Sequence, residues 1–479
     1  MALEYAMRTR LVSALVVGLL VFGACADDDG EEPSTQAGGE TTSTATPTGL
    51  DAGFGQNGVL ALPLSPDGHD RLLAVANGPD GSLYAAGWSA PGGDNAMVLA
   101  KIQADGQLDQ AFGQGGRAVV NVAVGGKAVE VARAVAVAPD GKILISGPVE
   151  KDPKATGAAA KDTNIAVLRF DAMGKADASF GKGGAAVIDI GPGKAVGESY
   201  VADNSWGMAA LSGGRVVVFG STAATDRNDA DYAIVGLTAA GALDPAFGSK
   251  GVTTVDVNQA TDNARGVAVQ PDGKLVFAGY SRNSEGVINP VVIRTTSDGK
   301  LDPGFGKDGV ATDSIIPGGI AEAYGVALQG DKFVLAGYGR GASAEEKVDL
   351  VSMRFNADGS WDKSYGTDGL TRIDIAGDAD RGRNVTVLPD GRILIVGSGS
   401  PEAGKSDAMV VLLDKDGKPA AGFGTQGRVL SDLGGPGDAW FGVTLAGDGR
   451  SVTVAGYKGA DPGATDGSND DAAVARIKL

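Results

Sequence analysis

From residue 49 to its last residue, the chain alternates short apolar runs with turns rich in glycine and aspartate. An Asp-Gly pair separates two apolar runs in segments such as QPDGKLVFAG at 270–279 and LPDGRILIVG at 388–397. Such a pair between apolar runs is a strong signal for a β-hairpin. No segment has a convincing helical period. The pattern therefore predicts short antiparallel strands.

A further apolar run follows each hairpin, and a repeated motif follows that run. In its fullest copies the motif reads LDxxFGxxG, and it occurs seven times. Its aromatic member falls at Phe54, Phe112, Phe180, Phe247, Phe305, Tyr365 and Phe423. The intervals between these aromatics are 58, 68, 67, 58, 60 and 58 residues. A recurring period indicates a repeat protein in which each unit is one supersecondary structure.

Each unit supplies four strands, which we name a, b, c and d from the centre of the predicted disc outwards. Strand a precedes the Asp-Gly turn, b follows it, c is the next apolar run, and d follows the FGxxG motif. Seven four-stranded antiparallel sheets around one axis make an all-β, seven-bladed β-propeller. The a–b and c–d turns then lie on one face, the turn face, and the b–c and d–a loops lie on the other, the loop face.

Two incomplete parts of one blade lie at the ends of the repeat region. An orphan strand d is expected at Val59–Leu64, and the chain ends on a strand c at Ala472–Leu479. Pairing these two strands closes the ring and removes two exposed sheet edges. The propeller is therefore expected to occupy residues 49–479.

The seven units resemble the delta-60 repeat family, whose members carry tandem LDxxFGxxG motifs together with a PDGK hairpin. The resemblance covers Gly49 to Leu479, and it rests on the order and spacing of the motifs. It implies a propeller-like architecture in an exported bacterial protein and implies no particular activity. We expect the repeated Phe, Asp-Gly and Gly residues to serve the blades, because a packing group is needed in every unit.

The first residues predict export. Arg8 and Arg10 precede an uncharged apolar run that stops at Cys25 and is too short to span a bilayer. The segment 22–25, Phe-Gly-Ala-Cys, resembles the bacterial lipoprotein box, which implies a signal peptide at 1–24 and lipidation of Cys25. An ordinary secretory signal with an idle thiol is the alternative. Residues 25–48 are acidic and lack large apolar side chains, so they are predicted to be a flexible tether.

Charge narrows the range of partners. The chain has a formal net charge of −18. Removal of residues 1–24 takes away two arginines and one glutamate, which leaves −19. Such a surface repels phosphate backbones, so nucleic acid is excluded as the main partner. A single cysteine allows no internal disulfide, and core burial must supply the stability. We expect a monomer.

The candidate site is a rim at the loop-face mouth of the central channel, where function on a rigid scaffold tends to lie. That face also carries the long insertions 148–163, 191–205 and 221–229. Just before each strand a, the aligned residues are Arg133, Trp206, Arg265, Tyr324, Arg383 and Phe441, with Arg71 as the seventh candidate. Acids stand three residues earlier in five blades: Glu130, Asp203, Asp262, Asp380 and Asp438. Arginine and aromatic side chains suit a peptide or a sugar. In the alternative interpretation each arginine pairs with a neighbouring acid and the aromatics only cover the channel lip.

Metal and enzyme chemistry find little support. Strand d carries a recurring polar position, filled by Asn121, Asp189, Asp256, Asp313, Asp374 and Asp432. We interpret these residues as charges that discourage edge pairing, because separate blades hold them too far apart for one ion. No calcium loop, nucleophile elbow or P-loop is present in the sequence, and His69 is the only histidine. The prediction includes no metal and no cofactor.

The sequence thus favours a binding or scaffolding protein of the cell envelope, at the outer membrane or cell surface. Its membrane contact would be the lipid on Cys25, and its ligand would be a peptide, glycan or protein bound on the loop face. The alternative is a carbohydrate-active hydrolase that uses carboxylates on the same face.

Overall fold

The computed structural model describes residues 49–479 except 66–68, 91–93, 124–128, 197–198, 284, 344, 377 and 460–469. The predicted signal peptide, Cys25 and tether lie outside the described residues. Among the described residues, no helix is long and apolar enough to cross a membrane.

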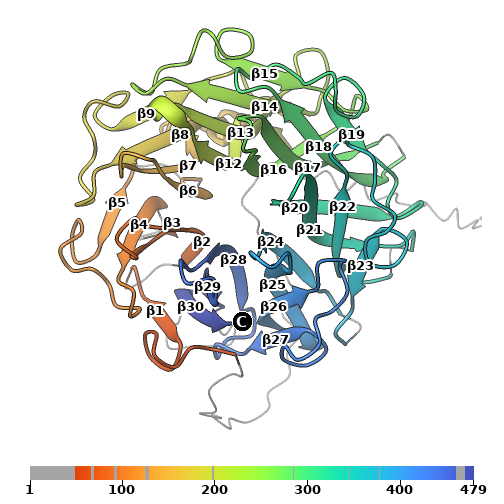
Figure 1. Cartoon of the computed structure of the whole chain (residues 1–479). Coiled ribbons are helices and arrows are strands. Elements are labelled where there is room, and N and C mark those ends of the chain that lie inside the picture. The colour runs from red at the N-terminus through yellow and green to blue at the C-terminus, as the bar shows by residue number, and fades with distance from the viewer. Residues whose placement is uncertain are drawn as a thin grey trace, which may run out of the picture.

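Seven antiparallel sheets of four strands surround a central axis (Figure 1). Strand a of each blade lies innermost (Figure 1). Blades are numbered from the first complete one, and their strands are given in the order a, b, c, d. Blade 1 is β2 (Asp70–Asn77), β3 (Leu83–Ser89), β4 (Ala96–Ile102) and β5 (Arg117–Val120). Blade 2 is β6 (Ala134–Val137), β7 (Ile143–Glu150), β8 (Thr163–Phe170) and β9 (Ala185–Ile188). Blade 3 is β12 (Asn204–Ala210), β13 (Val216–Ala223), β14 (Ala230–Leu237) and β15 (Val252–Val255).

The remaining blades follow the same order. Blade 4 is β16 (Asp262–Val269), β17 (Leu275–Arg282), β18 (Ile288–Thr295) and β19 (Val310–Thr312). Blade 5 is β20 (Ile320–Gln329), β21 (Lys332–Arg340), β22 (Asp349–Phe355) and β23 (Leu370–Ile373). Blade 6 is β24 (Arg381–Val387), β25 (Ile393–Glu402), β26 (Lys405–Leu413) and β27 (Arg428–Ser431). Blade 7 is β28 (Ala439–Leu445), β29 (Ser451–Lys458), β30 (Asp471–Lys478) and β1 (Val59–Leu62).

Blade 7 confirms the predicted closure. The N-terminal β1 pairs with the C-terminal β30, in the register Val59 with Ala475 to Leu62 with Ala472. In Figure 1 the orange β1 lies against the blue β30. One sheet thus joins the two ends of the repeat region, so this blade exposes its edges no more than the others.

The insertions expected on the loop face lie in b–c and d–a connections. Blade 2 carries a short 3₁₀ helix, Gly157–Lys161, between its strands b and c. The connection from β9 to β12 contains a hairpin of β10 (Lys194–Val196) and β11 (Ser199–Val201).

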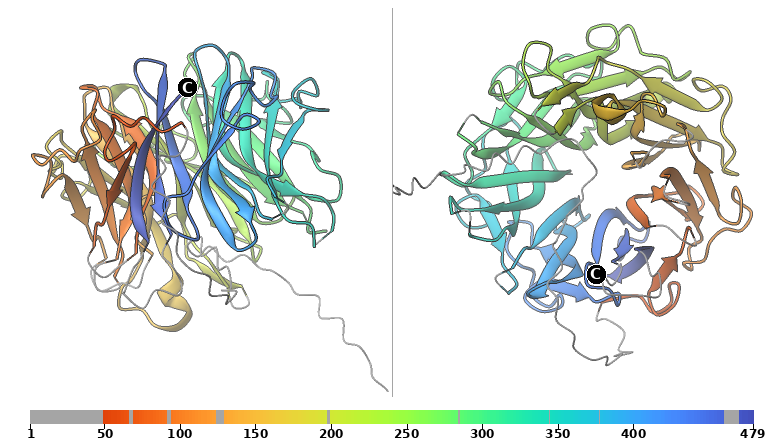
Figure 2. Two further views of the ribbon diagram at one scale, coloured as in Figure 1. Left: turned by 90° about the horizontal axis from the view of Figure 1, so that it is seen from below. Right: turned by 180° about the vertical axis from the view of Figure 1, so that it is seen from behind.

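On the turn face, a second 3₁₀ turn, Ser212–Gly214, takes the place of the Asp-Gly turn between strands a and b of blade 3. Figure 2 shows the disc from the side and from behind, with the strands running between the two faces.

The repeated aromatic fills the junction between neighbouring blades. Phe112 is 1% exposed, and Phe180 is fully buried. The glycine after Phe112 donates its N–H to the Met173 carbonyl in the next blade's c–d turn, at 2.8 Å. A Cβ on Gly174 of that turn would lie 2.9 Å from the Phe112 ring, and its φ is +77°. Glycine is therefore required there for both backbone conformation and close approach.

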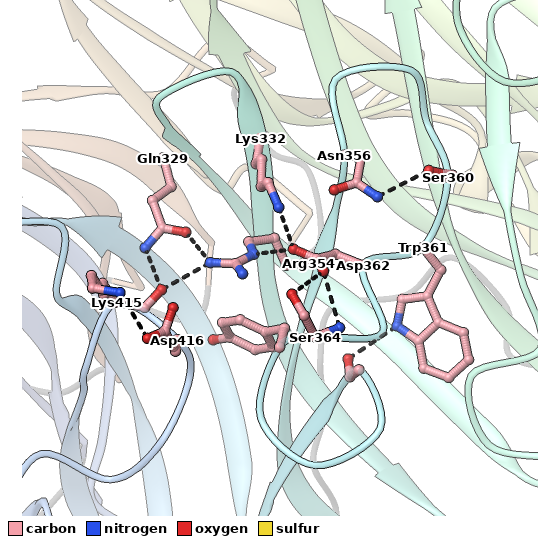
Figure 3. Close-up of polar contacts among 12 residues, drawn as sticks. Gln329, Lys332, Arg354, Asn356, Ser360, Trp361, Asp362, Ser364, Lys415 and Asp416 are labelled. Carbon is pink, nitrogen blue, oxygen red and sulfur yellow. Dashed lines mark hydrogen bonds and ion pairs between the residues drawn. The ribbon is translucent and has the colours of Figure 1, made fainter.

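The aspartate of the same motif accepts hydrogen bonds from side chains of strands b and c, as Figure 3 shows for blade 5. Asp362 accepts hydrogen bonds from Lys332 at 2.6 Å and from Arg354 at 2.8 Å. Arg354 also donates to the Lys415 carbonyl of blade 6 at 2.8 Å. Burial raises the pKa of Asp362, but these bonds and those from Ser364 outweigh it and hold the pKa below its usual range. The motif therefore links blades as well as strands, as expected for a repeated structural residue.

Candidate functional site: an arginine–aromatic belt at the channel mouth

A β-bulge in strand a turns one residue per blade toward the central channel. The pairing of strand a with strand b shifts register at one residue in blades 1 and 3–7: Leu73, Trp206, Arg265, Tyr324, Arg383 and Phe441. In blade 2 the equivalent Arg133 directly precedes β6, and its N–H donates to the Ser146 carbonyl at 2.8 Å. A bulge leaves one residue outside the ladder and re-aims its side chain. We call the seven residues the belt.

Small residues after the bulge let neighbouring strands a approach closely. A Cβ on Gly207 would lie 2.7 Å from the Arg265 carbonyl oxygen, and one on Gly442 would lie 2.8 Å from the Val75 nitrogen. Real side chains do not tolerate such contacts with backbone atoms. The glycines therefore bring belt residues of adjacent blades within reach of one another.

The belt alternates arginines and aromatic rings around much of the channel. The guanidinium carbon of Arg133 lies 3.6 Å from the Trp206 ring centre, and that of Arg265 lies 3.8 Å from the same ring. Arg265 is also 4.4 Å from the Tyr324 ring. Arg383 lies 5.2 Å from Tyr324 and 4.9 Å from Phe441. Each distance is within the range of a cation–π interaction, so the arginines are held by rings of the neighbouring blades.

Blade 5 adds a buried carboxylate, Glu322, two residues before the belt residue Tyr324. Glu322 accepts hydrogen bonds from the hydroxyls of Tyr280 and Tyr338, and burial raises its pKa. Arg265 donates to the Tyr280 hydroxyl at 2.9 Å and to the Tyr324 hydroxyl at 3.1 Å. The Tyr324 and Tyr338 hydroxyls lie 2.9 Å apart. Tyrosine hydroxyls thus connect Arg265 to Glu322, and the two hydrogen bonds that Arg265 donates to them hold its guanidinium in place.

The acids before the belt serve the d–a loops. They lie three residues before the belt residue in six blades: Asp70, Glu130, Asp203, Asp262, Asp380 and Asp438. Each accepts the backbone N–H found two residues past the preceding strand d, as from Ile190 to Asp203 at 2.6 Å. These carboxylates thus hold the backbone of the d–a loops in place. In blade 5 Ala321 holds this place.

Burial dominates the titration of these acids. Desolvation raises the pKa of Asp262 to about 9 and that of Asp438 to about 7, although loop amides donate to both. The same cause raises the pKa of Glu130 to about 7 and the pKa values of Asp203 and Asp380 to about 6. The loop face therefore carries carboxyls that titrate near neutral pH.

A cavity of about 200 Å³ opens between the belt residues. All six predicted rim residues line it, together with Leu73. Below the belt, the residue two positions further along strand a is apolar in every blade, and five of these residues line the cavity: Val75, Val135, Met208, Val267 and Val326. Among the described residues that line the cavity, none is aspartate or glutamate. The site is thus a cationic, aromatic ring above an apolar layer.

The predicted rim residues are therefore brought together, with one correction. The seventh position belongs to Leu73, because the bulge of β2 falls between Leu72 and Ala74. Arg71 instead contacts Asp470, at 2.6 Å, and covers the Tyr457 ring. The number of residues before strand a does not reveal where the bulge falls, so the sequence pattern pointed to Arg71. Glu322, Tyr280 and Tyr338 were also missed, although the acid shifted by one residue at Ala321-Glu322 breaks the repeat visibly.

Carboxylates do gather, where strands c and d of one blade meet the start of strand a of the next blade. The strand-d aspartates Asp256, Asp374 and Asp432 each lie near two acids of strand c or of the following strand a. The expectation that these residues lie too far apart for one ion considered only strand d across blades. A basic side chain contacts each group: Arg227 with Asp256 at 3.2 Å, Lys405 with Asp432 at 2.7 Å, and Arg372 with Asp349. Each group could hold a cation in principle, and a Lys or Arg already supplies the charge.

The solitary histidine lies on the loop face beside blade 7. His69 is exposed, and its Nδ1 accepts a hydrogen bond from the Asp470 N–H at 3.3 Å. Among the described residues, no serine or threonine is hydrogen-bonded to His69, as a nucleophile system would require. His69 is not among the residues that line the cavity of the belt.

Three segments of the chain match a sequence family described as "Domain of unknown function (DUF5122) beta-propeller": residues 78–112, 270–305 and 388–423. Each runs from the a–b turn through strands b and c to the aromatic of the FGxxG motif. These three segments are similar to the repeats of that family. Among curated proteins, no sequence matches the chain.

Solved structures give only distant likenesses. Sqt1 of Chaetomium thermophilum, bound to the N-terminus of the ribosomal protein L10, is 11% identical, with 88% of this chain and 100% of that chain covered and a TM-score of 0.41. A glucose dehydrogenase is 16% identical over 71% and 95% of the two chains, with a TM-score of 0.38. An α-L-arabinanase of Penicillium chrysogenum is 12% identical over 72% and 92%, with a TM-score of 0.39. These likenesses carry no argument about function.

Proposed function

We propose that this chain is a binding protein whose ligand site is the belt. One observation carries the proposal: seven equivalent positions converge on one cavity, and they hold arginine, tryptophan, tyrosine, phenylalanine and leucine instead of one repeated residue. Packing would be served by the same residue in every blade, as it is at the FGxxG motif. An asymmetric, concave site with aromatic and charged groups is typical of ligand binding.

The proposal is tested by a ligand screen on the purified full chain. Short peptides, oligosaccharides and small organic ions are each followed by calorimetry and by the change in tryptophan fluorescence. We expect binding that Trp206→Ala and Phe441→Ala abolish and that Trp361→Phe on the turn face leaves intact. Binding that survives both belt substitutions would place the site elsewhere and overturn the proposal.

A carboxylate-dependent hydrolase is the weaker candidate. Glycosidases of that kind need two carboxyl groups facing the substrate. The acids three residues before the belt accept hydrogen bonds from loop amides, Glu322 accepts them from tyrosine hydroxyls, and none of the described residues lining the cavity is an acid. Turnover of an oligosaccharide in the same screen, lost in Asp203→Asn or Asp262→Asn proteins that still fold, would favour the hydrolase.

We further propose that the propeller is held at the cell envelope by a lipid on Cys25. The support is the sequence of the first 25 residues, with an arginine-bearing leader and an apolar run that ends at the chain's one cysteine. In a bacterial host we expect the wild-type chain to take up labelled fatty acid and to remain in the membrane fraction. Cys25→Ser should take up none. An unlabelled wild-type protein would refute the lipid anchor.

A further inference from the structure

We propose that a second pocket, on the loop face of blade 4, binds one sugar unit through its hydroxyl groups. This inference goes beyond the proposed function, because the pocket shares no residue with the cavity of the belt. The described residues that line the pocket are all polar: Asn258, Asn283, Asn289, Thr312, Asp313 and Ser314. Its volume of about 460 Å³ equals about fifteen water volumes of the bulk liquid. That space suits a small ligand.

The walls of the pocket come from loop-face segments of two neighbouring blades. Asn258 lies in the d–a connection from β15 to β16, and Asn283 follows β17 in the b–c connection of blade 4. Asn289 lies in β18, and Ser314 comes two residues after the end of β19. The strands hold these side chains at the end of one sheet, and connections of this kind on a rigid scaffold commonly carry binding residues.

Blade 4 lacks the acids that gather at the equivalent place in blades 3, 5 and 6. Strand pairing puts Asn289 in the strand-c place, and Ala321 stands in the next strand a. Ser314, and not Asp313, lies five residues past the last glycine of its motif, where the strand-d aspartates of those blades lie. All three equivalent residues are uncharged. Asp313 is therefore the one carboxylate among the described residues that line the pocket.

The basic side chain of the other blades is missing here as well. In blade 6 the Lys405 Nζ lies 2.7 Å from Asp432, and in blade 2 the Lys151 Nζ lies 2.8 Å from Asp189. No lysine or arginine is among the described residues that line the blade 4 pocket. An ion pair of the chain itself thus occupies this place in other blades, whereas blade 4 has an open pocket with amide and hydroxyl groups.

Several polar groups of the pocket have no hydrogen-bond partner within the described part of the chain. The Oδ1 atom of Asn289 is buried and accepts no hydrogen bond. The side chains of Asn258, Asp313 and Ser314 make no hydrogen bond to a described residue. Asn283 differs, because its Oδ1 accepts two backbone N–H groups of its own loop at 3.0 Å. A buried acceptor without a partner costs free energy, and a ligand hydroxyl that donates to Asn289 would remove that cost.

The backbone beside the pocket has an unusual conformation. Seven described residues other than glycine have a positive φ. Five of them directly precede the last glycine of the FGxxG motif: Asn57, Lys250, Asp308, Asp368 and Gln426. The other two are neighbours, Asn258 with φ +65° and Gln259 with φ +53°. Outside the repeated motif, this conformation therefore occurs only at the pocket wall among the described residues. Such strain tends to persist where it positions groups for a ligand.

Amide and hydroxyl groups match the hydroxyls of a sugar. A side-chain amide has two N–H donors and an acceptor oxygen, and a sugar hydroxyl both donates and accepts. An ammonium ion has donors alone and would leave the amide N–H groups without acceptors. A calcium ion prefers several carboxylates, and the pocket has only Asp313 among its described residues. The two oxygens of Asp313 can instead accept from neighbouring hydroxyls of one sugar ring.

Methyl glycosides of glucose, galactose and mannose test the class of ligand. Each is added to the full chain and followed by saturation-transfer difference NMR, with cyclohexanol, butylamine and calcium chloride as comparisons. We expect one glycoside to bind with a dissociation constant on the order of 1 mM, since each hydrogen bond contributes modestly. Cyclohexanol has a similar ring and one hydroxyl, and it should bind at least about tenfold more weakly. If none of the glycosides binds, or if butylamine or calcium alone binds, the inference fails.

Matched asparagine variants locate the contact. Asn289→Leu keeps the size of the side chain and removes its amide, so it should weaken glycoside binding by about fivefold or more. Asn164→Leu is the control, because Asn164 has the same place in strand c of blade 2 and its Oδ1 is likewise buried without a partner. This control should bind like the wild type. Equal losses in both variants would overturn the assignment to blade 4.

An exposed residue guards against a failure of folding. Asn289 is half-buried, whereas Asp313 is exposed, so Asp313→Asn carries the smaller structural risk. It should also weaken the glycoside by about fivefold or more, because it removes a charged acceptor. Circular dichroism identifies any variant that does not fold. A glycoside that binds Asp313→Asn and Asn289→Leu as tightly as the wild type would place the sugar elsewhere.

Two further results separate the sources of the sugar and the two proposals. A tetrasaccharide of the sugar that binds best reports whether a unit within a chain is taken as well as a single sugar. Glycoside binding that survives Trp206→Ala and is lost in Asn289→Leu belongs to blade 4, and the belt is then judged on its other ligands. Glycoside binding that is lost in Trp206→Ala and kept in Asn289→Leu supports the belt and overturns this inference.

Discussion

The junctions between blades and the mouth of the channel show two uses of the same sevenfold repeat. At six junctions of the described structure, the glycine after the motif aromatic donates to a carbonyl of the next blade's c–d turn, with nearly constant distances of 2.7 to 2.9 Å. At the channel mouth the seven equivalent positions hold five kinds of residue. A packing contact that every blade needs uses the same residue type in every repeat, whereas a binding site needs different residue types at equivalent positions.

The seventh junction differs from the others in a measurable way. Phe423 is 8% exposed, while Phe180 is fully buried. Strands c and d of blade 7 come from the two ends of the repeat region, whereas Gly241 in the c–d turn of blade 3 lies against the Phe180 ring.

The largest expected effect compares these two aromatics. Phe180→Ala should lower the free energy of unfolding by about 4 kcal/mol, as for other buried Phe to Ala changes. Phe423→Ala should cost less, because Phe423 is 8% exposed whereas Phe180 is fully buried. Urea denaturation followed by circular dichroism measures both. Equal losses of unfolding free energy would mean that the junction at Phe423 is packed as well as the other junctions.

A pair of glycines sharpens the same comparison. Gly417 has φ +87°, and a Cβ there would lie 2.5 Å from Tyr365; Gly141 has φ +80°, and its Cβ would meet nothing within 4 Å. Both alanine variants carry the strain of a positive φ, which costs about 1 kcal/mol. Gly417→Ala should therefore lose about 2 kcal/mol more than Gly141→Ala, the range of an overpacked contact. If the two variants denature at the same urea concentration, close approach plays no part at the junction.

The loop face should respond to pH in a direction set by its buried acids. Burial raises the pKa of Asp203 to about 6, of Glu130 to about 7 and of Asp262 to about 9, above the value of about 4 in an unfolded chain. The folded state then binds more protons between these values, so their contribution to stability is complete below about pH 4 and is lost as pH rises through 6 to 9. Melting temperature should fall from pH 5 to pH 9.

Asp262→Asn is the matched variant for this effect. It should flatten the part of the pH dependence between 7 and 9 and leave the part near pH 6, which belongs to Asp203 and Asp380. A melting temperature that stays constant or rises over this range would show that the loop amides keep these carboxylates ionised.

The smallest expected effect on stability is at the belt. Arg133→Met should change the free energy of unfolding by less than about 1 kcal/mol, because a cation–π contact at a partly exposed site contributes about 0.5 to 1 kcal/mol. The same substitution is expected to weaken ligand binding strongly. A loss of several kcal/mol would instead mark the belt as part of the framework.

Sequence alone determined the blades. The short apolar runs, the Asp-Gly hairpins and the FGxxG motif predict four strands per unit, seven units and closure by the terminal strands, and the structure confirms each. These features are local, because the two faces of a strand and the geometry of a tight turn follow from residues a few positions apart. Counting within each repeat also found six of the seven belt residues.

Tertiary structure decided the chemistry at the channel mouth. Only the bulge in β2 shows that Leu73, and not Arg71, takes the seventh place. The stacking of Arg265 on Trp206 and Tyr324, and the burial of Glu322 against Tyr338, join side chains of different blades or strands. Such contacts depend on how blades pack and where bulges fall, and a local pattern of apolar and polar residues specifies neither.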